Sequence, residues 1–264
     1  MHWILHDGFF RGPGGQALPE SLKRLSLPMS MHKVVPFVGE LSPIPVLTTQ
    51  NVICMGAYSL RLVASRMAWR PGVFDIGVYD FVEQRKRWGE LMLNHDSVVC
   101  SLSEASFTSD RMFVRPTDDS KAFTGQAFDR GDFEEWRGRV CALDFAATVS
   151  LNADTVVQVS PIKTIHSEYR LWVVKGEIVT ASLYRRDGKG VFDAWVDPAV
   201  LAFAASAIDS KNGWQPHDAF VIDIADTPAG YRIIEINTLN ASGLYACDVT
   251  RLILALEDAF NEDA

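Results

Sequence analysis

The sequence lacks the apolar runs of membrane proteins and the positive charge of nucleic-acid binders. It contains no stretch of about 18 apolar residues, the length that spans a bilayer. Lys and Arg number 25 against 33 Asp and Glu, so the net charge is −8. Non-specific binding to phosphate backbones needs a strong basic field, so we expect neither a membrane partner nor a nucleic-acid partner. Residues 1–7 also lack a cationic segment followed by an apolar one, which predicts a cytoplasmic protein without an export signal.

Cysteine is scarce as well. The four cysteines, Cys54, Cys100, Cys141 and Cys247, form no Cys-x-x-Cys pair and have no histidine at zinc-site spacing. We therefore expect buried thiols in a reducing compartment. The glycine-rich segment 12–15 lacks the Gly-Lys-Ser/Thr ending of a phosphate loop, which predicts an ordinary loop.

Periodicity predicts a mixed α and β protein with a large core, since 48% of the 264 residues are hydrophobic. In the first hundred residues, extended segments at 33–38 and 44–47 precede a strand, a turn and a helix at 51–55, 56 and 57–67, and a charged helix follows at 80–88. That β-to-α step indicates an α/β layer. Farther along, the pattern predicts strands at 112–116, 155–159, 169–174, 177–182, 220–224 and 231–237, and helices at 133–140, 197–210 and 244–261.

The last predicted hairpin carries oxygen side chains inside apolar strands. Glu235 and Asn237 are two residues apart, so strand alternation points them to one face, while Ile234 and Ile236 face a buried layer. Asp223 lies in the preceding strand, and carboxylate and amide oxygens are ligands for hard cations. The pattern therefore predicts a three-ligand cation site.

The alternative is that these residues are the polar face of a half-exposed hairpin. The register decides part of this question, because directly opposed residues of an antiparallel pair share a face. Glu235 must oppose Val221, or another pairing with an even sum must hold. An odd sum would turn Asp223 to the other face.

Cationic residues in strands precede this hairpin. In chain order the series is Arg115, Gln158, Glu168 with Arg170, Arg185 with Arg186, Asp223, and Glu235 with Asn237. Arginines suit phosphate oxygens, and carboxylates suit a metal ion that bridges the same phosphates. A nucleoside triphosphate with bound magnesium fits this order.

The series resembles the ATP-grasp superfamily, in particular small phage and bacterial members with arginine in the phosphate-gripping strand. The motifs are Phe113-Val-Arg115-Pro, Ser167-Glu168-Tyr-Arg170-Leu-Trp-Val-Val, Ser182-Leu-Tyr-Arg185, Val221-Ile-Asp223-Ile and Ile234-Glu235-Ile-Asn237-Thr-Leu-Asn240-Ala-Ser-Gly243, within about residues 110–250. The resemblance implies an α+β ATP-grasp fold whose two α+β subdomains clamp ATP, preceded by a small α/β domain. The implied ranges are 1–104 for the N-terminal domain and 105–264 for the ATP-grasp domain, divided into 105–162, the lid and central subdomain, and 163–264, which carries the metal site.

The resemblance also implies the nucleotide contacts. Arg115 corresponds to the strand residue, usually Lys, that grips the α and β phosphates, and Lys121 lies in the loop that closes over them. Gln158 and Val159 fall where the family binds adenine. Lys163 would reach phosphate or be plain surface.

In the second subdomain, Glu168 resembles the acid that accepts the ribose hydroxyls. Arg170 would act in catalysis or form a cross-strand salt bridge with Glu168, and Arg185 would point toward the phosphate end. Asn240 begins the turn whose backbone amides bind an oxyanion. Asp223, Glu235 and Asn237 resemble the magnesium ligands, with Mn²⁺ as the other cation to consider.

We therefore expect an ATP- and magnesium-dependent ligase that joins the carboxylate of an amino acid or peptide to an amine through an acyl phosphate. The expected partner is a small-molecule or peptide substrate, and the oligomeric state, monomer or homodimer, is left open. An ATP-dependent phosphotransferase and a non-catalytic nucleotide-binding module are the alternatives. The first domain and the loops supply most substrate contacts in such a fold, so the acceptor cannot be identified from residue types.

Overall fold

The structure is a computed structural model that describes residues 1–12, 14–35, 40–118, 122–142, 151–209 and 215–261. The chain forms two compact units: unit 1 comprises Met1–Ile76 and Ile165–Ala264, and unit 2 comprises Gly77–Thr164. This division differs from the ranges 1–104, 105–162 and 163–264, which remain a prediction about the family's domains. None of the described helices has the length and apolarity needed to cross a bilayer.

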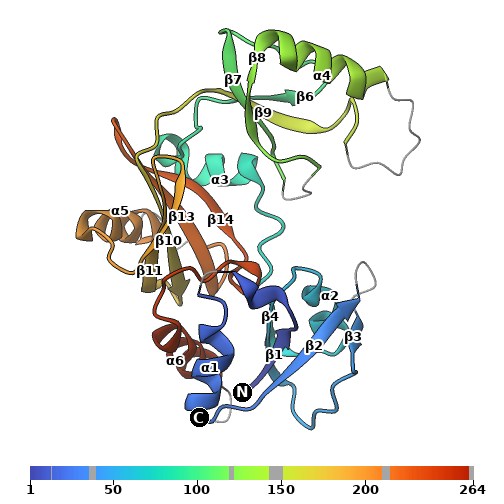
Figure 1. Cartoon of the computed structure of the whole chain (residues 1–264), viewed down its shortest axis with the longest axis vertical. Helices are drawn as coiled ribbons and strands as arrows, with labels where there is room; N and C mark the ends of the chain where they lie inside the picture. Colours follow the sequence, from blue (N-terminus) through green and yellow to red (C-terminus); the bar gives the residue numbers. More distant parts are fainter. Residues whose placement is uncertain (13, 36–39, 119–121, 143–150, 210–214, 262–264) are drawn as a thin grey trace. The chain divides into compact units, whose positions relative to one another are not determined.

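Unit 1 begins with a five-stranded sheet in the order β3-β2-β1-β4-β5 (Figure 1). The strands are β1 (His2–His6), β2 (Met29–Val35), β3 (Glu40–Ser42), β4 (Asn51–Met55) and β5 (Arg70–Gly72), with η1 (Phe9–Arg11), α1 (Ala17–Arg24) and α2 (Leu60–Arg66) between them. β1 is parallel to β2 and β4, and β4 is parallel to β5. The predicted strand-turn-helix step is thereby confirmed, although α2 is shorter than the predicted helix.

The second sheet of unit 1 is antiparallel, in the order β12-β11-β10-β13-β14. Its elements are β10 (Ser167–Val174), β11 (Glu177–Arg186), β12 (Lys189–Asp193), α5 (Pro198–Asp209), β13 (Ala219–Thr227), β14 (Gly230–Asn237), η3 (Leu239–Ala241) and α6 (Val249–Phe260). Both predicted hairpins, β10–β11 and β13–β14, are confirmed.

The two sheets of unit 1 share one hydrophobic core. Trp3 and Ile53 of the first sheet are fully buried in the same cluster as Trp172 and Val221 of the second. Helix α6 contributes its apolar side through Leu252, and it lies beside α1 (Figure 1). Helix α5 packs against β11, β13 and β14. The second sheet is therefore held by the N-terminal strands as well as by its own helices.

Unit 2 is a four-stranded antiparallel sheet in the order β6-β9-β7-β8. Its elements are α3 (Phe81–Trp88), η2 (Gly89–Leu91), β6 (Val98–Ser101), β7 (Arg111–Pro116), β8 (Gln126–Asp129), α4 (Arg130–Ala142) and β9 (Val156–Pro161). Helix α4 places Phe133 on the sheet, where it stacks with Phe107 at 4.4 Å between ring centroids. The predicted strands of this region and the helix around 133–140 are confirmed.

Several local expectations are wrong. The segment 44–47 is not a strand, and its Ile44 and Val46 are exposed. The final helix begins at Val249 instead of residue 244, because Asp248 caps it by accepting a hydrogen bond from the backbone N–H of Arg251. Residues 36–38 of the expected segment 33–38 lie outside the described residues.

The expectation of four buried thiols is also wrong. Cys54 and Cys247 are buried, Cys100 is half-buried and Cys141 is exposed. Cys141 follows Val140, which faces the core, so helical geometry turns the cysteine toward solvent.

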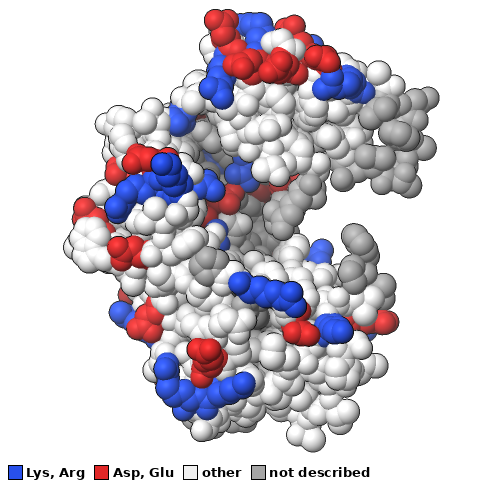
Figure 2. Space-filling model, in the orientation of Figure 1, with Lys and Arg blue, Asp and Glu red and all other residues white. Residues whose placement is uncertain are grey.

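Acidic and basic side chains are interspersed on the face shown in Figure 2. The described residues on that face form no continuous basic surface. This distribution agrees with the low positive charge of the sequence.

Asn240 connects η3 to the N-terminal sheet of unit 1. Its Nδ2 donates to the carbonyl oxygen of Cys54 at 2.6 Å, and its Oδ1 accepts from the backbone N–H of Phe74 at 2.8 Å. Its own carbonyl accepts from the N–H of Gly56 at 2.8 Å. The side chain is buried, so these bonds replace solvent.

We predict that Asn240→Ala lowers the free energy of unfolding by about 2–4 kcal/mol, because it leaves the buried Cys54 carbonyl and Phe74 N–H unpaired. Urea unfolding followed by circular dichroism measures the loss. The matched control is Asn94→Ala, since the half-buried Asn94 side chain makes no hydrogen bond within the described part of the chain. The control should change stability by less than about 0.5 kcal/mol, and equal losses in both variants would contradict the structural role.

Candidate functional site

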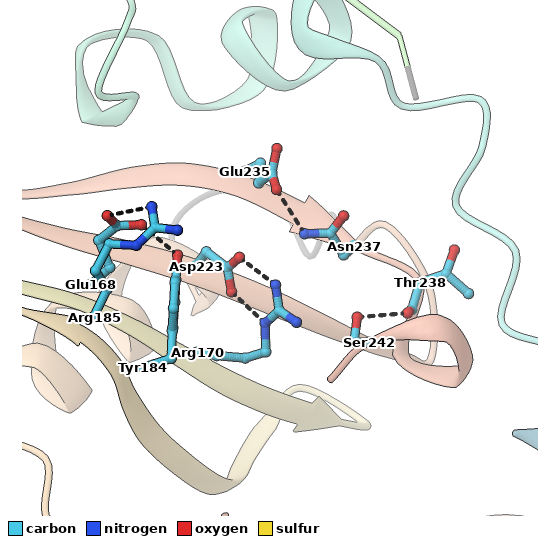
Figure 3. Close-up of polar contacts among 9 residues, drawn as sticks. All are labelled: Glu168, Arg170, Tyr184, Arg185, Asp223, Glu235, Asn237, Thr238 and Ser242. Atoms are coloured by element: carbon cyan, nitrogen blue, oxygen red, sulfur yellow. Dashed lines mark hydrogen bonds and ion pairs between the residues drawn. The ribbon is translucent and has the colours of Figure 1, made fainter. Parts of the chain in front are cut away.

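The polar side chains predicted as a cluster lie on one face of the second sheet of unit 1 (Figure 3). Asp223 of β13 directly opposes Glu235 of β14, and Val221 opposes Asn237. Both sums are even, so the register condition for a shared face is confirmed. A register shift follows Asp223, and it makes Ile233 instead of Ile234 the fully buried residue beside Ile236.

The same register joins Asp223 to Arg170 of β10, its direct partner on the other side. Arg170 Nε donates to Asp223 Oδ1 at 2.8 Å, and Nη2 donates to Oδ2 at 2.7 Å. The side chains are 11% and 2% exposed. This is a two-pronged buried ion pair, the strong form of an arginine–carboxylate contact, and it rules out an exposed hairpin surface at Asp223.

The charges around the pair oppose its desolvation. Burial raises the pKa of the Asp223 carboxyl, the Arg170 guanidinium counters that rise, and Glu235 and Glu168 add to it. Burial by itself would lower the pKa of Arg170, but the Asp223 carboxylate outweighs burial and raises it, so Arg170 stays charged. An unpaired buried charge would cost several kcal/mol, on the order of the desolvation penalty per ion.

Glu168 begins a second network on this face. Tyr184 donates its hydroxyl to Glu168 Oε2 at 2.8 Å, and Arg185 Nη1 donates to Oε1 at 3.1 Å. Two consecutive residues reach the same carboxylate because a register shift lies between the pairs Glu168–Arg185 and Tyr169–Leu183. The alternative salt bridge between Glu168 and Arg170 is not formed, since Arg170 pairs with Asp223.

Tyr184 acts in this network as a neutral donor. Burial, together with the nearby Asp223 and Glu168 carboxylates, raises the pKa of its phenol. The hydroxyl therefore remains protonated and orients the Glu168 carboxylate.

Glu235 and Asn237 supply the oxygen donors at the end of β14 (Figure 3). Asn237 Nδ2 donates to Glu235 Oε1 at 3.0 Å, and this contact fixes the amide with its oxygen on the other side. No group of three or more His, Cys, Asp or Glu side chains that could hold a metal ion occurs among the described residues. The predicted set has two carboxylates and one amide, and such a set of hard oxygen donors fits Mg²⁺ or Mn²⁺.

In unit 2, Arg115 lines a pocket of about 370 Å³. The pocket is formed by the face of β7 and the following segment, through Phe113, Arg115, Pro116, Asp118, Phe123, Thr124 and Gly125. Gly125 is needed here, because a Cβ at this position would lie 2.8 Å from Arg115 Cβ. A cation in a concave, half-polar pocket suits an anionic group.

Other predicted nucleotide contacts in unit 2 have partners within the unit. Gln158 is buried and accepts from Ser97 Oγ at 3.3 Å, and Val159 belongs to the hydrophobic core. Their strand, β9, is paired on both sides. Lys163 forms an ion pair with Asp96. Lys121 lies outside the described residues.

The resemblance places Asn240 in the oxyanion-binding turn. Its side chain is engaged with β4 and the segment after β5, as described above. The side chain therefore holds the turn against the N-terminal sheet.

Sequence reasoning missed two tyrosines of the site, Tyr184 and Tyr245. Strand alternation puts Tyr184 on the opposite face from Arg185, and the register shift reverses that assignment. The sequence pattern predicts a helix at Tyr245, whereas its φ of 50° puts it in a tight turn. Arg170 lies over both rings. The signal available in the sequence was the aromatic residue next to each motif.

An antiparallel sheet that carries this row of cations and carboxylates, joined to an α/β layer, defines an ATP-grasp protein. Residues 45–256 match a family of ATP-grasp domains, the third family of its clade, and the chain belongs to that family. The predicted α+β ATP-grasp fold is thereby confirmed. No curated protein matches the chain.

Solved structures support the same fold. D-alanine–D-alanine ligase from Bacillus anthracis is 10% identical, with a TM-score of 0.62 over 99% of this chain and 98% of that one. D-cycloserine synthetase DcsG is 13% identical, with a TM-score of 0.61 over 97% and 98%. A RimK domain ATP-grasp protein from Sphaerobacter thermophilus is 12% identical, with a TM-score of 0.59 over 92% of each chain.

We predict that Asp223→Ala lowers the free energy of unfolding by about 3–5 kcal/mol, because it leaves the Arg170 charge buried without a partner. The double substitution Arg170→Met with Asp223→Leu should cost less than the single one, since it buries no charge. Urea unfolding measures both variants.

The control uses the exposed ion pair Lys175–Asp218, whose side chains are 49% and 56% exposed. Asp218→Ala should cost less than about 1 kcal/mol. A loss for Asp223→Ala no larger than this control would show that burial adds nothing to the Arg170–Asp223 pair.

Proposed function

We propose that this protein is an ATP- and magnesium-dependent ligase that joins the carboxylate of an amino acid or peptide to an amine. The observation that carries the proposal is the shared face of β10, β13 and β14, where the Arg170–Asp223 pair lies beside Glu235 and Asn237. Family membership supports the use of ATP. D-alanine–D-alanine ligase and ATP-grasp ligase PsnB are among the proteins of similar fold.

The proposed reaction has two steps. A substrate carboxylate oxygen attacks the γ-phosphorus of ATP, which forms an acyl phosphate and releases ADP. The amine then attacks the acyl carbon, the C–O bond to phosphate breaks, and the amine loses a proton as the amide and inorganic phosphate form. Positioning and charge neutralisation drive such transfers, so no nucleophilic Ser or Cys is required.

In this proposal Arg170 stabilises the transferring phosphoryl group. Its Nε and Nη2 are bound by Asp223, and its Nη1 has no hydrogen-bond partner within the described parts of the chain. An arginine anchored on one edge presents the other edge in a fixed direction, which preorganises the charge. Arg185, about half exposed and anchored on Glu168, would contribute a second cation.

Glu235 and Asn237 would hold Mg²⁺, with Asp223 completing the set through the second lone pairs of its oxygens. A bound Mg²⁺ supplies positive charge that neutralises the phosphates. In the family's pattern, Arg115 of unit 2 grips phosphate oxygens and Glu168 accepts the ribose hydroxyls. Tyr184 and Arg185 would keep the Glu168 carboxylate oriented for those hydroxyls.

We predict that Glu235→Gln reduces ADP release by about 100-fold or more, because the isosteric amide keeps the shape of the site and removes a charge that the cation requires. ADP release is measured with ATP, Mg²⁺ and mixtures of amino acids or short peptides, and mass spectrometry identifies the products. Binding of Mn²⁺, followed by electron paramagnetic resonance, should weaken in parallel.

The matched control is Glu177→Gln, at the exposed start of β11 in the same sheet, which should keep wild-type turnover. Normal ADP release by Glu235→Gln would overturn the metal assignment. A stable phosphorylated product in place of an amide would identify a phosphotransferase, and tight ATP binding without any turnover would identify a nucleotide-binding module.

A further inference from the structure

Three aromatic rings form a stack beside Arg170. Tyr184 and Tyr245 are 5.1 Å apart between centroids with an interplanar angle of 15°, and Phe192 and Tyr245 are 5.5 Å apart at 12°. Arg170 Cζ lies 5.6 Å from the Tyr184 centroid and 5.2 Å from that of Tyr245. These distances are within the range of cation–π attraction, so the two tyrosines hold a guanidinium whose far edge is bound by Asp223.

The backbone at Tyr245 is strained. Its φ of 50° is left-handed, a conformation that L residues other than Asn and Asp seldom adopt. The turn is fastened to β11 through Ala246, whose N–H donates to Ser182 Oγ at 3.2 Å, and Asp248, whose N–H donates to Thr180 Oγ1 at 2.9 Å. Strain of this kind persists where surrounding contacts enforce it and is concentrated at functional sites.

The glycine-rich segment at the start of the chain provides one of those contacts. A Cβ at Gly14 would lie 1.7 Å from the Tyr245 carbonyl oxygen and 2.8 Å from its carbonyl carbon, and Gly14 itself has a φ of 73°. No side chain fits there. At Gly12, in the same segment, a Cβ would have no heavy atom within 4 Å. The Tyr245 turn is therefore enclosed between Gly14 and β11.

We propose that Tyr245 is a positioning residue for Arg170, and that Gly14 acts on Arg170 through Tyr245. Asp223 fixes one edge of the guanidinium, and the Tyr184 and Tyr245 rings fix where its plane lies. The catalytic consequence rests on the proposed function of Arg170 in phosphoryl transfer. The close approach at Gly14 gives the segment 12–15 a role that its lack of a phosphate-loop ending left unassigned.

The test compares Tyr245→Phe with Tyr245→Leu in the full-length chain. The phenylalanine keeps the ring, so kcat for ADP release should remain within about 2-fold of wild type. The leucine removes the ring and should lower kcat by about 10- to 100-fold, because small misplacements of a catalytic group are costly. The KM for ATP should change less than kcat, since ATP keeps its other contacts.

Gly14→Ala should lower kcat in the same direction. Combined with Tyr245→Leu it should add little, since both changes act through one element. Gly12→Ala is the matched control and should match wild type. Thermal melting checks folding, and Tyr245→Met replaces the leucine variant if that variant does not fold. Additive losses in the double variant would overturn the link between Gly14 and Tyr245.

A second readout does not require turnover. In protein labelled with ¹⁵N-arginine, hydrogen exchange at the Arg170 Nε–H should accelerate in Tyr245→Leu and Gly14→Ala and stay slow in Tyr245→Phe and Gly12→Ala. Unchanged exchange in Tyr245→Leu would overturn the positioning role, whatever happens to kcat. Accelerated exchange in a protein that turns over no ATP would support positioning and overturn the proposed function instead.

Discussion

The buried ion pair between Arg170 and Asp223 is the interaction around which the site is organised. Replacing such a pair by apolar residues is often neutral or stabilising, so global stability alone does not explain its presence in the centre of a sheet. What the pair provides is direction: β10 and β13 are direct neighbours, and their register presents the guanidinium at a defined place. Glu235, on the next strand, adds its negative charge at the same level, so cation and anion alternate across three strands.

Register shifts determine which side chains join this row. The shift beside Glu168 brings Tyr184 and Arg185 to one carboxylate, and the shift after Asp223 exchanges Ile233 for Ile234 in the buried layer. Each shift costs one regular pairing and redirects a side chain. The polar face is thus produced by departures from alternation as much as by alternation itself.

Alternation and turn chemistry were sufficient to predict both hairpins, the β4–α2 step and the shared face of Asp223, Glu235 and Asn237. They could not predict the position of Tyr184, because a register shift depends on pairing with another strand. The partners of Arg170 and Asn240 also depend on residues far away in the chain, namely Asp223 and the backbone around Cys54 and Phe74. Strand β1 was missed because it is short and almost wholly apolar, and such a run gives no periodic signal.

The shared core of unit 1 has a consequence for how the protein is made. Its strands β1 and β4 are synthesised early, but the residues that cover them, such as Trp172 and Leu252, leave the ribosome after the whole of unit 2. Unit 2 is continuous in sequence and has its own core, so it can fold on the nascent chain while the N-terminal strands wait with exposed apolar surface. During translation, the first segment to emerge belongs to the last unit to fold, which makes it the part most in need of chaperone protection.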